Sequence, residues 1–142
     1  LKLAEKLNKI TYDYVVLLQP TSPFRTINEI DQAIKKLIKL KYDSLISLCE
    51  LQGAHPIKMK KIVKKLVRNF IPKSPENPPR QLLQKLYVPS GNIYIVRRNV
   101  LLKKRSLIGK KQTFTIINKK RLVNIDNIND FENAKIKLRN FK

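Results

Sequence analysis

The 142-residue chain has few of the residue types that build disulfides and metal centres. It contains one cysteine, Cys49, and one histidine, His55, so an internal disulfide is excluded and a zinc site has too few ligands. A single cysteine fits a reducing compartment, and we predict a cytoplasmic location. No run of about 18 apolar residues occurs, so we expect no transmembrane helix and no membrane partner.

Acidic residues are also scarce, with 10 Asp and Glu against 31 Lys and Arg and a formal net charge of +21. A charge of this size can mark a protein that binds nucleic acid. The lysines outnumber the arginines and are scattered along the chain, without a surface pattern of arginines and aromatics. Compositional drift in an AT-rich genome, together with attraction to anionic substrates, is therefore the favoured explanation over nucleic-acid binding.

What the chain does have is an alternation of apolar runs with helical patterns, and 42% hydrophobic residues, enough for a packed core. The continuous apolar run Tyr14–Leu18 predicts a strand buried on both faces, and Ser44–Leu48 predicts a second strand. Between them, Thr26 and Glu29 fit a capping box that begins an amphipathic helix reaching about Leu40. The pattern predicts the α/β class, with three layers and a mostly parallel sheet.

Region 55–89 has a different composition. Met59–Phe70 mixes apolar residues with lysines without a helical stripe, which predicts a hairpin projecting from the main sheet. The prolines that follow predict a loop. Beyond this region we expect three strands, a short helix and a last helix capped by Asn127. The strands are expected at Asn92–Val96, Thr113–Ile117 and Leu122–Ile125, the short helix at Val100–Lys104, and the inward side of the last helix at Phe131, Ala134, Leu138 and Phe141.

The loop after the first strand is a candidate ligand site. Ligands of open α/β sheets bind beyond the carboxyl ends of the strands, which is where Gln19, Thr21 and Ser22 lie. Their amide and hydroxyl groups can orient a polyhydroxylated ligand. The alternative is that these are ordinary turn and cap residues.

Two further candidate positions carry cations. Lys58, in His55-Pro56-Ile57-Lys58, lies just after a predicted strand end and can meet an anion as a point charge. Arg80, followed by Gln81, comes after a stiff proline-rich loop and offers a planar fork for a carboxylate. Solvated side chains are the alternative for both cations, and a structural role is the alternative for His55.

The last candidate is Asn124-Ile125-Asp126, which precedes the start of the last helix. Positions 124 and 126 point to the same side of an extended segment. Their oxygens are ligands that Mg²⁺ prefers, so Asp126, with Asn124, is a candidate metal site. The alternative is that Asp126 or Asn127 only caps the helix.

These places, in this order, resemble one family: the acylneuraminate cytidylyltransferases, also called CMP-sialic acid synthetases, with their pseudaminic and legionaminic acid relatives. The resemblance spans nearly the whole chain and implies a Rossmann-like, nucleotide-diphospho-sugar-transferase-like fold. It is carried by Leu17-Leu18-Gln19-Pro20-Thr21-Ser22-Pro23-Phe24-Arg25, Asp43-Ser44, His55-Pro56-Ile57-Lys58, Arg80-Gln81, Gly91-Asn92-Ile93-Tyr94-Ile95, and Asn124-Ile125-Asp126 with Asp130-Phe131.

The resemblance implies a nucleotidyltransferase that joins CTP to a nine-carbon keto-acid sugar, a nonulosonic acid, and releases pyrophosphate. The implied cofactor is Mg²⁺, which steadies the charge that develops on the phosphates. It implies that Gln19 contacts the sugar and that Lys58 and Arg80 meet the carboxylate side of the sugar. Asp126 is the implied catalytic residue, which helps to hold the metal, and Thr21, Ser22 and Gln81 are further candidate substrate-binding residues. It also implies a homodimer in which region 55–89 reaches toward the partner subunit.

The chain departs from the family pattern in three places. Asn124 stands where the family has an Asp, and Ser90 stands where it has an Asn. Nothing before Tyr14 resembles the family's opening strand and CTP-binding loop, and the chain begins Leu1-Lys2-Leu3 without an initiator Met. We therefore expect residues 1–142 to be the C-terminal part of one cytidylyltransferase domain that is inactive by itself. A degenerate non-catalytic remnant or a regulatory partner is the alternative, and sialic, pseudaminic and legionaminic acids all stay open as the sugar.

Overall fold

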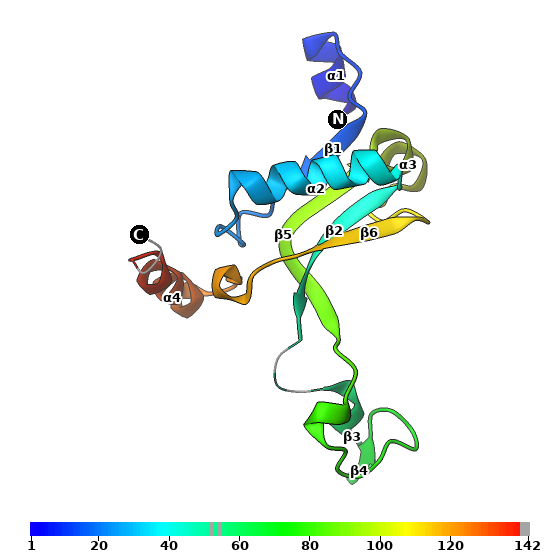
Figure 1. The fold of residues 1–142 in the computed structure, drawn as a ribbon, viewed down its shortest axis with the longest axis vertical. Helices are drawn as coiled ribbons and strands as arrows, with labels where there is room; N and C mark the ends of the chain where they lie inside the picture. The colour runs from blue at the N-terminus through cyan, green and yellow to red at the C-terminus, as the bar shows by residue number, and fades with distance from the viewer. Residues whose placement is uncertain (52, 54, 140–142) are drawn as a thin grey trace. The chain divides into compact units, whose positions relative to one another are not determined.

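The structure is a computed structural model that describes residues 1–51, 53 and 55–139. The chain divides into two compact units (Figure 1). Unit 1 comprises Leu1–Cys49 and Pro89–Lys142, and unit 2 comprises Glu50–Val88. Unit 2 is therefore inserted into the sequence of unit 1, and the predicted region 55–89 falls almost wholly within it.

Unit 1 contains a four-stranded sheet in the order β1–β5–β2–β6. The strands are β1 (Tyr14–Leu17), β2 (Ser44–Glu50), β5 (Tyr87–Arg97) and β6 (Gln112–Ile116). β2 and β6 pair in parallel, whereas β1 and β5 pair antiparallel. β5 is also the hydrogen-bonded neighbour of β2 and runs in the opposite direction to it (Figure 1). The predicted α/β class is confirmed. The prediction of a mostly parallel sheet was wrong: the sheet is mixed, because the late strand β5 inserts between β1 and β2 and pairs antiparallel with β1.

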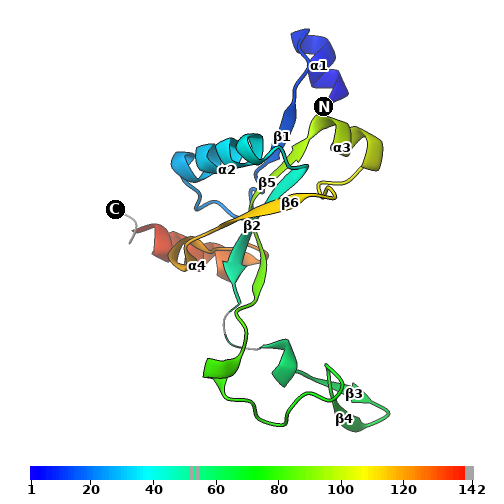
Figure 2. The same cartoon turned by 45° about the vertical axis from the view of Figure 1, so that its right-hand side comes forward.

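Helix α2 (Ile27–Leu40) forms the main core with this sheet (Figure 2). Its predicted capping box is present: the Thr26 hydroxyl accepts from the Glu29 backbone N–H, and the Glu29 carboxylate accepts from the Thr26 N–H. Burying a leucine side chain contributes about 1.5–3 kcal/mol, so the inward stripe of α2 fixes the helix on the sheet. The buried core residues are Ala33, Leu37, Leu45, Ile93, Ile95 and Ile117.

β1 is less buried than its sequence predicted. Val16 and Leu17 are 37% and 38% exposed, so the expectation of a strand buried on both faces was wrong. The reason is position, because β1 is an edge strand, paired along one side with β5. An apolar run predicts a strand but does not say how many neighbours cover it.

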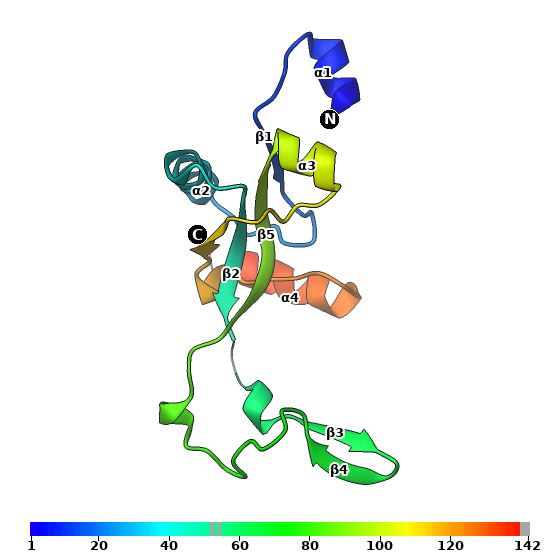
Figure 3. The same cartoon turned by 90° about the vertical axis from the view of Figure 1, so that its right-hand side faces the viewer.

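Three further helices complete unit 1: α1 (Lys2–Asn8), α3 (Arg98–Lys104) and α4 (Ile128–Arg139). α2 and α3 lie on opposite sides of the sheet (Figure 3). In α4 Ala134 is buried, but Phe131 and Leu138 are 44% and 58% exposed, contrary to prediction, and Phe141 lies outside the described residues. Among the residues that the structure describes, no helix is long and apolar enough to cross a membrane.

The predicted strand at Leu122–Ile125 is absent from the described structure. A short 3₁₀ turn at Lys119–Arg121 precedes this segment, and the Ile125 N–H donates to the Thr21 carbonyl at 2.9 Å. That bond joins the segment to a loop rather than to a strand, so no β ladder forms.

Unit 2 contains a two-stranded hairpin of β3 (Lys60–Val63) and β4 (Leu66–Asn69), with Ile62 opposite Val67 (Figure 3). The hairpin lies where the sequence predicted one. Its turn consists of Lys64 and Lys65, both in the left-handed region at φ 48° and 65°. A two-residue hairpin turn with positive φ at both central positions is of type I′, which glycine and asparagine normally supply, so the lysines adopt it at some cost.

Candidate functional site

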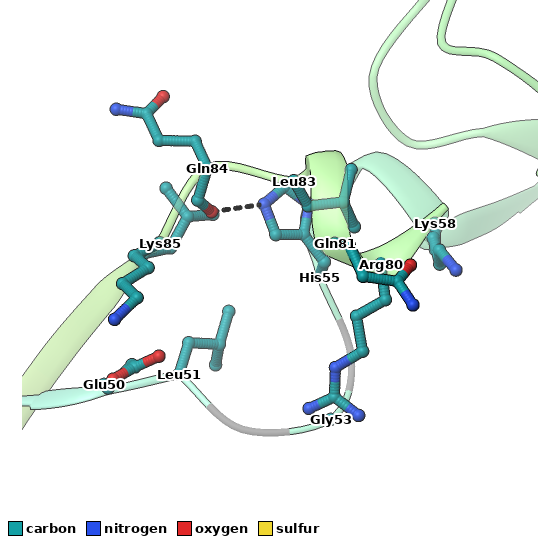
Figure 4. Close-up of a pocket in the computed structure, with 11 residues that line it drawn as sticks. Glu50, Leu51, Gly53, His55, Lys58, Arg80, Gln81, Leu83, Gln84 and Lys85 are labelled. Carbon is teal, nitrogen blue, oxygen red and sulfur yellow. Dashed lines mark hydrogen bonds between the residues drawn. The ribbon is translucent and has the colours of Figure 1, made fainter. Parts of the chain in front are cut away.

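A cavity of about 310 Å³ lies within unit 2 and is lined by the predicted residues Lys58, Arg80 and Gln81 (Figure 4). Lys58 is distant in sequence from Arg80 and Gln81, so the folding of unit 2 brings them together. Glu50 and Lys85 line the same cavity. We refer to this cavity as the unit 2 pocket.

Two short 3₁₀ turns position the cations of the pocket. The turn Pro56–Lys58 is capped by His55, whose Nδ1 accepts from the Ile57 N–H at 3.2 Å. The other ring nitrogen of His55, Nε2, lies 3.3 Å from the Gln84 carbonyl, a contact that fits the neutral tautomer with the proton on Nε2 (Figure 4). His55 therefore connects the turn Pro56–Lys58 with the backbone at Gln84, which is the structural role that the sequence offered as its alternative. Arg80 begins the second turn, Arg80–Leu82, directly after Pro79.

The pocket is electrostatically positive. Lys58, Arg80 and Lys85 contribute cations, and Glu50 contributes a carboxylate. Within the described part of the chain, the ion pairs lie elsewhere and none engages these three cations. An unpaired guanidinium at the wall of a pocket can bind a ligand carboxylate through two parallel hydrogen bonds. The arrangement is suited to a small organic anion.

The loop after β1, in unit 1, is held in one shape by Arg25. One guanidinium nitrogen of Arg25 donates to the carbonyl oxygens of Gln19 and Ser22, at 2.9 and 2.5 Å. The Ser22 N–H closes the turn on the Gln19 carbonyl at 3.1 Å. Ser22 itself is fully buried, so its hydroxyl is available to the protein interior rather than to a ligand. Arg25 is a positioning residue that sequence reasoning passed over.

Gly91 on β5 lets this loop approach the sheet. Its φ is +77°, and a Cβ at this position would lie 2.7 Å from both Gln19 Oε1 and Ser22 Oγ. The Ser22 hydroxyl donates to the Ser90 carbonyl at 3.4 Å. Gln19 Oε1 thus lies directly over the β5 backbone at Gly91. A glycine inside a strand pattern signals a bulge or a close approach, but it does not reveal what approaches.

A buried serine pair fixes β5 next to β2 at the same place. The Ser90 hydroxyl donates to Ser47 Oγ at 2.8 Å, and the Ile93 N–H donates to the same oxygen at 2.8 Å. The Ser47 hydroxyl oxygen thus takes the place of a backbone carbonyl as the acceptor for the Ile93 N–H, close to Gly91, whose positive φ distorts the backbone of β5. Ser90, one of the departures from the family pattern, has a structural role here.

Asn124 and Asp126 lie beside this loop, since Ile125 is bonded to the Thr21 carbonyl. Both side chains are exposed, and the Asn124 amide donates to Asp126 Oδ2 at 2.6 Å. Asn127 caps the start of α4 as predicted, since its Oδ1 accepts from the Asp130 N–H at 3.0 Å, and the Asp130 carboxylate in turn accepts from the Asp126 and Asn127 N–H groups. Among the described residues, no group of three or more His, Cys, Asp or Glu could hold a metal ion. One carboxylate fits a Mg²⁺ that substrate phosphates and water also hold, but it does not make a complete protein site.

The predicted residues therefore form two groups, each within one unit. Lys58, Arg80 and Gln81 line the unit 2 pocket, whereas Gln19, Thr21, Ser22, Asn124 and Asp126 gather at the loop after β1 in unit 1. Cys49, at the end of β2, joins neither group as a nucleophile: burial raises the pKa of its thiol, which keeps it protonated and unreactive.

Of the comparisons with known proteins, the one with solved structures finds a similar fold. No family model matches the sequence, and no curated protein matches it significantly. Among solved structures, the chain is similar to one described as CMP:2-keto-3-deoxy-manno-octonic acid synthetase complexed with CTP, at a TM-score of 0.62 and 13% sequence identity. The match covers 99% of this chain and 68% of that chain. The chain therefore shares its fold with that synthetase.

Proposed function

We propose that the chain belongs to a cytidylyltransferase that transfers CMP from CTP to a sialic-acid-type nonulosonic acid and releases pyrophosphate. The observation that carries the proposal is the fold likeness to a CMP–acid-sugar synthetase over 99% of the chain. The ordered motifs of the sequence favour the acylneuraminate branch of such enzymes. The proposal includes a three-layer architecture for the complete domain. Both lines of support lead to the same reaction chemistry, the attack of a sugar hydroxyl on the α-phosphate of CTP.

In this proposal the unit 2 pocket binds the carboxylate end of the sugar. Arg80 supplies the bidentate fork, Lys58 a second positive charge, and Gln81 a neutral hydrogen-bonding group. An acid sugar offers one fixed negative charge, which matches a pocket with unpaired cations. Gln19, whose Oε1 lies over Gly91, contributes an amide from the group of predicted residues at the loop after β1.

The proposal also assigns a magnesium ion to Asp126, with Asn124 beside it. Bound there, Mg²⁺ would steady the negative charge of the phosphates during transfer. The chain's own residues supply one charged ligand, and Asp130 keeps the backbone of this segment in place through the α4 cap. With a neutral Asn124 beside Asp126, a bound ion would depend more on the substrate's phosphates for its negative ligands.

We extend the proposal to a homodimer formed through region 55–89. The hairpin exposes a cross-strand apolar pair, Ile62 and Val67, which are 80% and 69% exposed. An isolated two-stranded hairpin is only marginally stable, so covering this pair with a second copy would stabilise it.

Substitution of Arg80 tests the function. Arg80→Ala removes both charge and fork, and a charge-assisted hydrogen bond contributes about 1.5–3 kcal/mol, so kcat/KM for the sugar should fall about 10- to 150-fold. Arg80→Lys should recover only part of this loss, and the KM for CTP should barely move. The measurement is CTP-dependent pyrophosphate release by the full-length gene product, with each substrate varied in turn.

Arg68→Ala is the matched control, because Arg68 belongs to the same unit but does not line the pocket. It should leave the kinetics for both substrates unchanged. If the defect of Arg80→Ala falls on CTP, or if Arg68→Ala has the same effect, the assignment of Arg80 to the sugar is wrong.

A second candidate function is a non-catalytic partner that binds the sugar. The bond from the Asn124 amide to Asp126 favours it, because this neutral donor occupies a carboxylate oxygen that a metal would use. Such a protein would bind an acid sugar through Arg80 without releasing pyrophosphate, so the same assay combined with sugar binding separates the two functions.

A further inference from the structure

We propose that one face of the unit 2 hairpin binds the surface of a membrane that contains anionic lipids. The proposal is independent of the proposed function. The expectation that the chain has no membrane partner followed from the absence of a spanning segment, and a peripheral contact requires none. Unpaired cations around an apolar pair of side chains carry the proposal.

The hairpin has two different faces (Figure 3). In the register of β3 and β4, Lys61 lies opposite Arg68, and Val63 lies opposite Leu66. Because side chains alternate along a strand, these four residues share one face, opposite to the face that the proposed homodimer covers. Val63 and Leu66 are 41% and 56% exposed. We refer to these four residues as the basic face of the hairpin.

The charges of the basic face have no partner within the hairpin. Like charges directly opposite each other, as Lys61 and Arg68 are, destabilise an antiparallel pair. The adjoining turn adds Lys64 and Lys65. Residues 51–75 contain no aspartate or glutamate, and among the residues that the structure describes none of these four cations forms an ion pair. An anionic partner would relieve the repulsion between them.

A hollow of about 450 Å³ beside the hairpin offers a place for a lipid headgroup. Lys61, Arg68 and Lys73 line it. Phosphate oxygens accept charge-assisted hydrogen bonds from such cations. A headgroup phosphate in the hollow leaves Val63 and Leu66 to contact the apolar region just below the headgroups, as in other peripheral membrane contacts.

Charge and apolarity together decide between the possible partners. A two-fold interface brings the same patch of two subunits together, so a second copy would place cations against the same cations. Nucleic acid fits the cations, but bases stack on aromatic side chains, whereas Val63 and Leu66 are aliphatic. An anionic bilayer matches both features, because it offers phosphates and an apolar layer side by side.

The experiment measures co-sedimentation of the chain with two kinds of vesicle. One consists of phosphatidylcholine alone, and the other contains about 30% phosphatidylglycerol. The chain should bind the anionic vesicles and not the neutral ones, and NaCl at about 0.5 M should release it. Equal binding to both kinds of vesicle would overturn the proposal, as would binding to neither.

Lys64→Asn combined with Lys65→Gly is the informative variant, because Asn-Gly is the preferred sequence of a type I′ turn. It removes two cations and also relieves the positive-φ strain of the turn. The hairpin should therefore become more stable to urea while the affinity for anionic vesicles falls roughly 10- to 30-fold. A loss of affinity cannot then be attributed to unfolding.

Lys35→Gln combined with Lys39→Gln is the matched control, because it removes two exposed cations from α2 and changes the net charge equally. Screening of charges outside the contact should keep its effect below about 3-fold. If both lysine pairs weaken binding alike, the attraction is one of overall charge and the hairpin is not the contact.

Val63→Thr combined with Leu66→Thr tests the apolar part of the face. Threonine keeps the strand propensity and the charge, so the fold should be retained while vesicle affinity falls about 10-fold. Unchanged affinity would overturn the assignment of this face to a bilayer. A short DNA duplex serves as competitor, and a duplex that binds more tightly than the anionic vesicles would identify nucleic acid as the partner instead.

Discussion

At the scale of single residues, Gly91 combines two demands that no other residue type meets. Its positive φ disfavours any side chain, and Gln19 and Ser22 occupy the space a Cβ would need. The sequence predicted Gly91 only as the start of a strand. Its contacts come from a loop that is far away in the chain, so a local pattern could not have identified them.

Gly91→Ala should therefore destabilise the protein more than a positive φ alone explains. Gly53 is the comparison, since it has φ +82° but nothing within 4 Å of an added Cβ. Gly53→Ala should cost about 1–2 kcal/mol from backbone strain. Gly91→Ala should add about 1–3 kcal/mol from overpacking, and it should weaken sugar binding by displacing Gln19. Urea unfolding of the two variants measures the difference, and equal losses would show that the loop moves aside freely.

At the scale of elements, sequence reasoning succeeded where the determinants are local. The start of α2 was predicted because Thr26 and Glu29 satisfy each other within one turn. The strand at Leu122–Ile125 was predicted wrongly because an apolar run becomes a strand only beside a free strand edge, and here a loop occupies that place. The exposed residues of α4 are a similar case, since spacing predicts which residues share a face but not what covers it.

The attachment of helix α1 to the rest of unit 1 should depend on pH. None of its residues is buried, and the Arg98 side chain, at the start of α3, holds it through a two-pronged bond to Glu5 with distances of 2.5 and 2.9 Å. The hydrogen bond from Arg98 lowers the pKa of the Glu5 carboxyl. A lowered folded pKa means that this stabilisation is complete above the ordinary value of a glutamate and is lost as pH falls through the folded value.

We expect hydrogen exchange of the α1 amides, corrected for intrinsic rates, to increase as the pH is lowered from 7 toward 3. Glu5→Gln removes the titrating group and should show fast exchange already at neutral pH. The amides of α2 supply the internal reference, because the buried Ala33 and Leu37 hold that helix on the sheet without any contribution from Glu5. Exchange in α1 that is unaffected by both pH and substitution would mean that Glu5 does not hold the helix.

At the scale of the whole molecule, the order of the strands was the part of the fold that the sequence did not reveal. β5 follows unit 2 in the chain yet lies between β1 and β2 in the sheet. Strand order depends on contacts between distant segments, and nothing in the local pattern of Asn92–Val96 specifies its neighbours. The same limit applies to the site: local patterns predicted Lys58 and Arg80 singly, and only the family resemblance implied that both meet one side of the sugar. Folding places them on one pocket with Glu50.

The charge of the whole chain leads to the last prediction. A net charge of +21 in 142 residues creates self-repulsion in the folded state that a few ion pairs do not offset. Raising the NaCl concentration from about 0.05 to 0.5 M shortens the screening length severalfold, so the repulsion should weaken and the Tm should rise. A gain of about 1 kcal/mol corresponds to roughly 3–5 °C for a chain of this size. KCl should act as NaCl does, whereas a response that depends on the identity of the anion would indicate anion binding. A Tm that falls with salt would show that the ion pairs, such as Arg121 with Glu29, outweigh the repulsion.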